Sequence, residues 1–471
     1  MKKRAAQRRE ARINRRSFLR LGALGGLSAA AATSPILARV VENHVRPASA
    51  STPDVDSFEL DEMSIADLRA AITKGRLSAR SVAQKYLERI EEIDRRGPSV
   101  NSVIEINPDA LKIAEALDRE LKGHGPRGPL HGVPLLIKDN IDTADRMLTT
   151  AGSLALVGAK PLRDAFVVER LREAGAVILG KTNLSEWANF RSTHSTSGWS
   201  GRGGQTRNPY ALDRNPCGSS SGSGAAVAAN LCAAAIGTET DGSIVCPASS
   251  NGIVGIKPTL GLVSRSGIIP ISHSQDTAGP MARTVADAAA LLTALASTYD
   301  TRDPSTLGNI KRNLSTNYTQ FLDASGLRGA RLGVARKFFG FSDKVDALMN
   351  DAIDMMKRSG AVVIDPADIP SHGKFDDSEY EVLLYEFKAD LNKYLAALVS
   401  GSHPRTLKAL IEFNEKNKDR EMPYFGQEIF VKAEAKGPLT ERAYLAALRK
   451  NHLLSRAQGI DAVMARHKLD A

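Results

Sequence analysis

Residues 164–179 read DAFVVERLREAGAVIL and predict a helix that runs directly into a strand. The helix is expected from Asp164 to Ala174, where Gly175 stops it, and the strand from Ala176 to Leu179. A helix joined to a strand in this way is the repeating unit of proteins in which helices cover a mainly parallel sheet.

The same alternation extends along the chain in both directions. Before it, two amphipathic helices are expected, from Ser64 to Thr73 and from Ser78 to Arg95. Each begins at a capping serine. The further expected strands are 103–106, 133–137, 233–236, 331–334 and 362–364, and the further expected helices are 108–122, 225–231 and 345–357. We therefore expect an α/β fold class: one large domain over residues 51–471 with a mixed, mainly parallel β-sheet covered by helices on both faces. The polar stretch 297–320 is the best candidate for a boundary, but the alternation resumes after it.

Composition excludes several classes of protein. The chain has 471 residues, of which 42% are hydrophobic and 25% charged, so disorder and a disulfide-stapled miniprotein are excluded. The net charge of +10 is concentrated in residues 1–50, where eleven Lys or Arg face only Glu10 and Glu42. The other residues carry about +1 in total, so the chain lacks the basic surface that nucleic acid would require.

The N-terminal segment resembles a twin-arginine export signal. Asn14-Arg15-Arg16-Ser17-Phe18-Leu19-Arg20 precedes a charge-free stretch, 21–37, and small residues follow at 48–50. A disordered basic tail or a membrane anchor are the alternatives, but the apolar stretch is weak for a bilayer span. We expect residues 1–50 to be a signal peptide read by the twin-arginine translocase. The mature chain, beginning near Ser51, is expected to be periplasmic or secreted, without stable membrane anchoring.

The chain contains three cysteines, Cys217, Cys232 and Cys246, which cannot all pair with one another. They lack the spacing of metal ligands. We expect them to be buried small apolar residues.

Two short motifs suggest chemistry that their context does not support. Residues 175–182, GAVILGKT, match the phosphate-loop pattern, but a helix precedes the first glycine and the four apolar residues form the strand itself. Residues 218–222, GSSSG, match the α/β-hydrolase pattern around Ser220, with His273, His372 or His403 as possible bases. That pattern requires a strand leading into it, whereas 198–217 is rich in glycine and proline.

Three separated segments carry a more specific signal: GVPLLIKDN at 132–140, CGSSSGS at 217–223 and GTETDGSI at 237–244. In this order they resemble the amidase signature family, and Gly180-Lys181-Thr182-Asn183 resembles a further family segment. The similarity runs from about Ser64 to the C-terminus, and Ser219 and Ser243 are 24 residues apart, as in the family.

The resemblance implies a Ser-Ser-Lys triad of Lys138, Ser219 and Ser243. Ser243 would be the nucleophile, Ser219 would relay its proton, and Lys138 would be the base once burial makes the amine neutral. The family holds the relay serine by a cis peptide bond, here Gly218–Ser219. Backbone N–H groups of Thr240, Asp241, Gly242 and Ser243 would face the developing oxyanion. No cofactor and no metal ion is expected.

Each triad residue also has an ordinary structural interpretation. Lys138 could be a surface lysine, Ser219 and Ser223 loop or capping serines, and Ser243 the N-cap of a helix from Ile244. Their occurrence together, in matching segments, favours catalysis. The chain departs from the commonest family pattern at Asp241, where Gly is usual, and at Val245, where Arg is usual.

The segments SSSGSGAAVAAN, GTETDGSIVCPA and SQDTAGPMA look most like those of bacterial peptide amidases, which release ammonia from C-terminal peptide amides. The resemblance therefore implies a small-molecule or peptide amide as substrate. The alternatives are an amidotransferase-like protein that uses charged transfer RNA, and an inactive amidase-fold binding protein. A helix is expected over 458–468, and the family has further segments after it, so we expect the C-terminus at Ala471 to be truncated, leaving an unpaired sheet edge.

Overall fold

The computed structural model describes residues 56–296, 299–308, 317–399 and 402–471. The signal peptide predicted at 1–50 lies outside the described residues. Residues 58–471 form one compact unit by their internal contacts.

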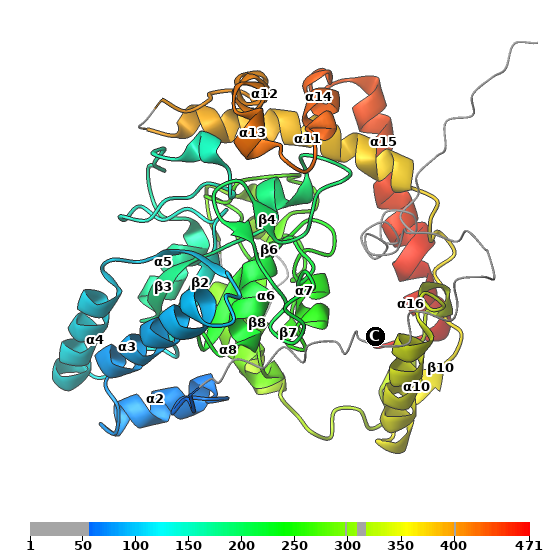
Figure 1. Ribbon diagram of the computed structural model, residues 1–471. Helices are drawn as coiled ribbons and strands as arrows, with labels where there is room; N and C mark the ends of the chain where they lie inside the picture. The colour runs from blue at the N-terminus through cyan, green and yellow to red at the C-terminus, as the bar shows by residue number, and fades with distance from the viewer. Residues whose placement is uncertain (1–55, 297–298, 309–316, 400–401) are drawn as a thin grey trace, which may run out of the picture. The chain divides into compact units, whose positions relative to one another are not determined.

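The predicted helix and strand at 164–179 are present. Helix α5 (Phe166–Glu173) leads through Gly175 into strand β3 (Val177–Thr182) (Figure 1). Gly175 has φ 85°, and a Cβ there would meet His131 Cα at 2.8 Å. Only glycine fits this conformation and this close approach, which is why the helix ends here.

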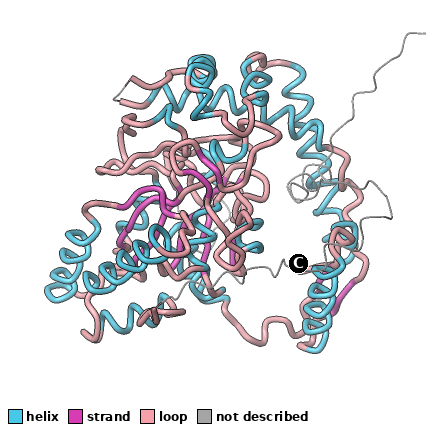
Figure 2. The backbone as a smooth tube through the Cα atoms, viewed as in Figure 1, coloured by secondary structure: helices cyan, strands magenta, loops and turns pink. Residues whose placement is uncertain are grey.

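The central sheet has the strand order β1-β3-β2-β6-β8-β7. Its remaining strands are β1 (Val103–Ile106), β2 (Pro134–Lys138), β6 (Ala234–Glu239), β7 (Val254–Gly255) and β8 (Thr277–Ala282). β2 pairs in parallel with β3 and β6, whereas β1 and β8 run antiparallel to their neighbours. The predicted mixed, mainly parallel sheet is confirmed, because β2, β3, β6 and β7 run in one direction and β1 and β8 in the other. Figure 2 shows the strands in the interior with helices around them.

Helices in two groups pack on this sheet. The first group contains α2 (Ile65–Thr73), α3 (Ala79–Arg89), α4 (Ala110–His124), α5 and α8 (Val285–Leu295), and the second contains α6 (Ser221–Ala228) and α7 (Val245–Ser250). Ser64 and Ser78 cap α2 and α3, as predicted. Helix α6 begins at Ser221, four residues before the predicted start. Its glycines allow this, because a Cβ at Gly222 would meet Ser102 O at 2.2 Å.

A second layer consists of helices and packs against the loops next to the sheet. It comprises α11 (Asp376–Ala397), α12 (Leu407–Lys416), α13 (Lys418–Glu421), α14 (Glu428–Glu434) and α15 (Arg442–His452). Apolar residues of α11, α12 and α14 form a cluster with Trp187, Phe190, Ile269 and Ile271 from the sheet layer. Helix α11 is thereby fixed against the loop that precedes β8.

The predicted elements beyond residue 330 are also present. Strands β9 (Arg331–Gly333) and β10 (Val362–Ile364) pair in parallel, connected by α10 (Asp343–Arg358). Helix α16 (Asp461–His467) leads to the last residues, and Gly333 N donates to Ala471 O at 2.9 Å. Within the described segments, no helix combines the length and the apolar character needed to cross a bilayer.

Candidate active site

Lys138 is the last residue of β2 and is fully buried between β3 and β6. Its Nζ lies 2.7 Å from Ser219 Oγ, 2.9 Å from Thr238 Oγ1 and 3.3 Å from Thr238 O. Burial lowers the pKa of Lys138 to about 7, although the carboxylates of Glu239 and Asp276 act in the opposite direction. The interpretation of Lys138 as a surface lysine is therefore wrong.

The three oxygen neighbours can take N–H bonds from the protonated amine, and they also allow a neutral nitrogen whose lone pair accepts one hydroxyl proton. A neutral amine has two N–H donors and one lone pair. Thr238 O can only accept, and Thr238 Oγ1 can accept a second bond. The lone pair is then left for the hydroxyl proton of Ser219, which lies at the shortest of the three distances.

Ser219 is fully buried and lies two residues before α6, where the segment 217–223 meets the segment 237–244. The expected cis peptide bond Gly218–Ser219 is present. Gly218 has no room for a side chain, because a Cβ would meet Ser185 Oγ at 2.2 Å. The next residue, Ser220, donates its N–H to Ser243 O at 3.1 Å, which ties the segment of Ser219 to that of Ser243.

Ser243 closes the turn between β6 and α7 and is 8% exposed. Gly242 O accepts from Cys246 N at 2.9 Å and so points into α7. Because C=O and N–H of one trans peptide point in opposite directions, the N–H of Ser243 points away from the helix. Among the described residues, Ser243 Oγ has no hydrogen-bond partner, and Ser219 Oγ is bonded to Lys138 Nζ and not to Ser243. The Ser243 hydroxyl is therefore free to face a substrate.

Ser219 and Ser243 line the same cavity, with a volume of about 510 Å³. Its apolar wall is the run Ile268–Ile271, and its polar wall includes Thr238, Glu239, Thr240 and Asp276. A pocket with one apolar wall and a few convergent polar groups is typical of a small-molecule site.

Two carboxylates beside this cavity could not be assigned from the sequence. Glu239 Oε2 accepts from Ile244 N at 2.7 Å and Val245 N at 3.0 Å, and so holds the first N–H groups of α7. Asp276 accepts from Thr240 Oγ1 at 2.5 Å.

The side chain of Val245, one of the positions that depart from the common family pattern, is exposed, so the missing arginine leaves the cavity intact.

The two rejected motifs do not form sites. Lys181 and Thr182 lie within β3, and Lys181 Nζ donates to Ile141 O at 2.6 Å and Thr149 Oγ1 at 2.8 Å. Ser220 is fully buried and its Oγ donates to Thr238 O at 3.1 Å. Neither a phosphate loop nor an exposed nucleophile is present at these positions.

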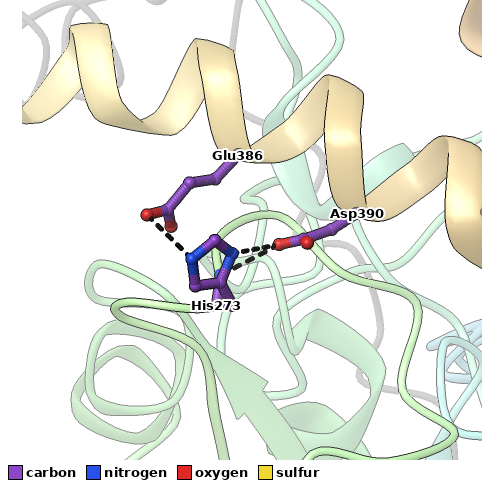
Figure 3. A group of neighbouring side chains, drawn as sticks. All are labelled: His273, Glu386 and Asp390. Atoms are coloured by element: carbon purple, nitrogen blue, oxygen red, sulfur yellow. Dashed lines mark hydrogen bonds and ion pairs between the residues drawn. The ribbon is translucent and has the colours of Figure 1, made fainter. Parts of the chain in front are cut away.

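His273 is held by two carboxylates of α11 (Figure 3). Its Nδ1 lies 2.7 Å from Asp390 Oδ2, and its Nε2 lies 3.3 Å from Glu386 Oε1. The hydrogen bond to Asp390 raises the pKa of His273. These three residues have the chemistry of a metal site, but both ring nitrogens already face carboxylates, which is the arrangement of an imidazolium. His273 therefore has no nitrogen available as a base for a serine.

The expectation for two of the cysteines is wrong. Cys217 and Cys246 form a disulfide with a Cα–Cα distance of 6.0 Å, and Cys232 is the buried thiol. Cys217 lies two residues before Ser219 and Cys246 three residues after Ser243. The turn at 240–243 brings the two segments together, an approach that cysteine spacing alone does not reveal.

Comparison with known proteins agrees with this geometry. A family model described as Amidase matches residues 81–468. The X-ray structure of the peptide amidase of Stenotrophomonas maltophilia superposes with a TM-score of 0.83 at 53% identity, covering 88% of this chain and 84% of that one. A protein of Arabidopsis thaliana named Probable amidase is 47% identical over 88% of this chain and 80% of its own length. A glutamyl-tRNA(Gln) amidotransferase subunit of Halorhodospira halophila is 41% identical over 65% of this chain and 60% of its own length.

The chain therefore belongs to the amidase family, and it is an amide-hydrolysing enzyme. Of the three proteins named above, the peptide amidase shares the highest identity with it.

Proposed function

We propose that this enzyme hydrolyses the C-terminal carboxamide of peptides to a carboxylate and ammonia, through an acyl-enzyme on Ser243. The observation that carries the proposal is the 2.7 Å contact between the buried Lys138 Nζ and Ser219 Oγ, beside a cavity that Ser243 also lines. A buried lysine with a pKa of about 7 is a suitable base near neutral pH.

Acylation begins when Ser243 Oγ attacks the amide carbon. The hydroxyl proton of Ser243 passes to Ser219 Oγ as the proton of Ser219 passes to Lys138 Nζ. The carbonyl oxygen becomes an oxyanion facing the N–H groups of Thr240, Asp241, Gly242 and Ser243. One well-placed donor of this kind is worth about 3 to 4 kcal/mol in the transition state.

The same relay then runs in reverse. The C–N bond breaks as the leaving nitrogen takes a proton from Ser219, which Lys138 reprotonates, and ammonia departs. Water next attacks the ester carbon while its proton travels through Ser219 to Lys138. Breakage of the ester bond returns that proton to Ser243 and releases the carboxylic acid, which ionises to the carboxylate in solution.

A peptide amide is the proposed substrate because the chain is similar over most of its length to a peptide amidase. The similarity to the amidotransferase covers a smaller share of both chains. The near-neutral charge outside residues 1–50 also argues against transfer RNA as a substrate. An inactive binding protein is not favoured, because Lys138, Ser219 and Ser243 are all retained.

We also propose that the protein is exported by the twin-arginine translocase and acts in the periplasm or outside the cell. The proposal rests on Arg15, Arg16 and the apolar segment after them. The Cys217–Cys246 disulfide supports it, because structural disulfides persist in oxidising compartments and are rare in the cytosol.

Single substitutions test the triad. Ser243→Ala and Lys138→Ala should each abolish acyl-enzyme formation, measured as fluorophosphonate labelling and as ammonia release from a peptide amide. His273→Ala should retain most activity, because both its ring nitrogens are bound to carboxylates. Loss of activity in His273→Ala together with an active Lys138→Ala variant would overturn the triad.

A substrate panel tests the proposed specificity separately. Ammonia release should be fastest with peptide amides and slower with aryl and aliphatic amides of equal concentration. Faster release from a simple aliphatic amide would leave the enzyme an amidase but reject the peptide substrate.

A further inference from the structure

We infer that Asp276 is a positioning residue. Through Thr240, it fixes residues 240–243, here called the oxyanion turn, to the wall of the substrate cavity. This inference rests on the proposed function, because it assigns a role in forming the acyl-enzyme on Ser243. Asp276 lies outside the triad and outside the turn, at the residue before β8.

The carboxylate of Asp276 bonds to both sides of the cavity. On one side, Oδ1 accepts from Thr240 Oγ1 at 2.5 Å. On the other, Oδ2 accepts from Ile271 N and Ser272 N, each at 2.8 Å. Asp276 is half-buried and lines the cavity itself, so it connects the turn to the wall at the point where substrate would bind.

Sheet pairing does not hold the start of the turn at 240–243. The regular pairing of β6 with β8 ends at Glu239, opposite Thr277. Gly242 has φ 87°, and a Cβ there would meet nothing within 4 Å, so no side chain packs against that side of Gly242. The bond from Thr240 therefore holds the first residue of the turn, where the sheet no longer does.

Hydrogen bonds from other elements also hold the wall to which Asp276 attaches. Glu386 of α11 is fully buried and accepts from Ser272 Oγ at 2.5 Å and Ser274 N at 3.0 Å. Ile269 N donates to Asn140 O at 2.9 Å, close to Lys138. A turn tied to this wall keeps its N–H groups in the orientation that an oxyanion requires, whereas a donor displaced by a fraction of an ångström loses much of its effect.

Asp276 also influences the base. Its negative charge favours the protonated form of Lys138 and so raises the pKa of that amine. Burial raises the pKa of Asp276 itself to about 6, so most of the carboxylate is ionised at neutral pH and accepts a hydrogen bond from the Thr240 hydroxyl. A purely structural aspartate would not alter the titration of the base.

The test is a double-mutant cycle of Asp276→Asn and Thr240→Val, with kcat and KM measured on a peptide amide. Each single variant should lower kcat about 10- to 100-fold, a part of what loss of a whole oxyanion donor costs, and change KM less than threefold. The kcat of the double variant should lie within about threefold of the kcat of the slower single variant. Thr240→Ser, which keeps the hydroxyl, should restore most of kcat.

Two further readouts separate positioning from general destabilisation. Asp276→Asn should move the acid limb of the pH–rate profile to lower pH, because Lys138 loses a neighbouring negative charge. Asp94→Asn is the matched control: Asp94 accepts from Ser102 N, Ser102 Oγ and Val103 N, the same set of one hydroxyl and two backbone N–H groups, away from the cavity. It should leave kcat and the pH profile unchanged.

The inference is wrong if the two substitutions act independently, if KM rather than kcat changes, or if the acid limb does not move in Asp276→Asn. A kcat loss in Asp94→Asn as large as in Asp276→Asn would also reject it, because general destabilisation would then explain both. Failure of the proposed function is seen separately, as fluorophosphonate labelling of the wild type at a residue other than Ser243.

Discussion

At the scale of single residues, the environment of Lys138 explains how a lysine serves as a base. Its amine is buried at the end of a strand, and its three neighbours within hydrogen-bond distance are hydroxyl and carbonyl oxygens of Ser219 and Thr238. Water would stabilise the charged form by several kcal/mol relative to such an interior. Two nearby carboxylates, Glu239 and Asp276, limit the effect, so that the pKa stops at about 7.

This pKa predicts the pH dependence of catalysis. Only the neutral amine can accept the proton from Ser219, so kcat/KM for an uncharged peptide amide should fall about tenfold per pH unit below pH 7. Initial rates between pH 5 and pH 8.5 measure this limb. A flat profile across that range would exclude Lys138 as the base.

The free energy of unfolding should also depend on the titration of Lys138. The folded-state pKa of Lys138 lies below that of an unfolded lysine, so between about pH 7 and pH 10 the unfolded state binds more protons and stability rises with pH. Lys138→Met, which cannot titrate, serves as the control and should lack this part of the slope in thermal unfolding.

At the scale of elements, the disulfide joins the two segments that carry the catalytic serines. Cys217 is in the loop before α6 and Cys246 is in α7, 29 residues further on. The segments already share the hydrogen bond from Ser220 N to Ser243 O. The covalent link therefore adds to a contact that sets the relation of Ser219 to Ser243.

Loss of this link should lower both stability and turnover. A closed loop of this length contributes roughly 3 to 4 kcal/mol by restricting the unfolded chain. Cys217→Ser combined with Cys246→Ser should therefore lower the unfolding midpoint, and kcat should fall because the serine segments are less fixed.

A reductant provides the control for this prediction. It should lower the midpoint of the wild type and of Cys232→Ala, whose disulfide is intact, but leave the double serine variant unchanged. An equal response of the double variant to the reductant would mean that the disulfide is not the source of the effect.

At the scale of the whole molecule, the charge is divided unevenly along the chain. Residues 1–50 hold nearly all of the net +10, and the residues that form the sheet, the helical layer and the cavity are close to neutral together. This distribution of charge is consistent with the export proposed above.

Export predicts the effect of changing the arginine pair. Arg15→Lys with Arg16→Lys should retain the protein in the cytoplasm, because the translocase recognises the paired arginines. Cell fractionation measures the location, and alkylation of Cys217 and Cys246 reports whether they have been oxidised. Undiminished appearance of this variant outside the cytoplasm, with the disulfide formed, would reject the signal.

The local elements could be predicted, and the residues of the proposed triad selected, from the sequence because their signals are local. Capping serines, the stop at Gly175 and runs of apolar residues depend on neighbours within a few positions, and so α2 and α5 were predicted within two residues of their observed bounds. The helix predicted to Arg95 is α3 as far as Arg89 and then a π-helix, Ile90–Arg96, and β3 continues three residues beyond its predicted end. Lys138, Ser219 and Ser243 lie in short segments whose resemblance to a family needs no knowledge of their contacts. Even so, the start of α6 was misjudged, because close packing at Gly222 decided it.

The contacts between those segments were decided only by the tertiary structure. Asp276 meets Thr240 across 36 residues, and Glu386 meets Ser272 across 114. The Cys217–Cys246 pair likewise forms because the order β2-β6-β8 and the turn after β6 bring distant segments to one edge of the sheet. Residue type and spacing do not predict such contacts, because the contacts depend on the order of the strands in the sheet. The sequence by itself thus determined which residues could react, whereas the fold decided the lowered pKa of Lys138 and the groups that hold the oxyanion turn.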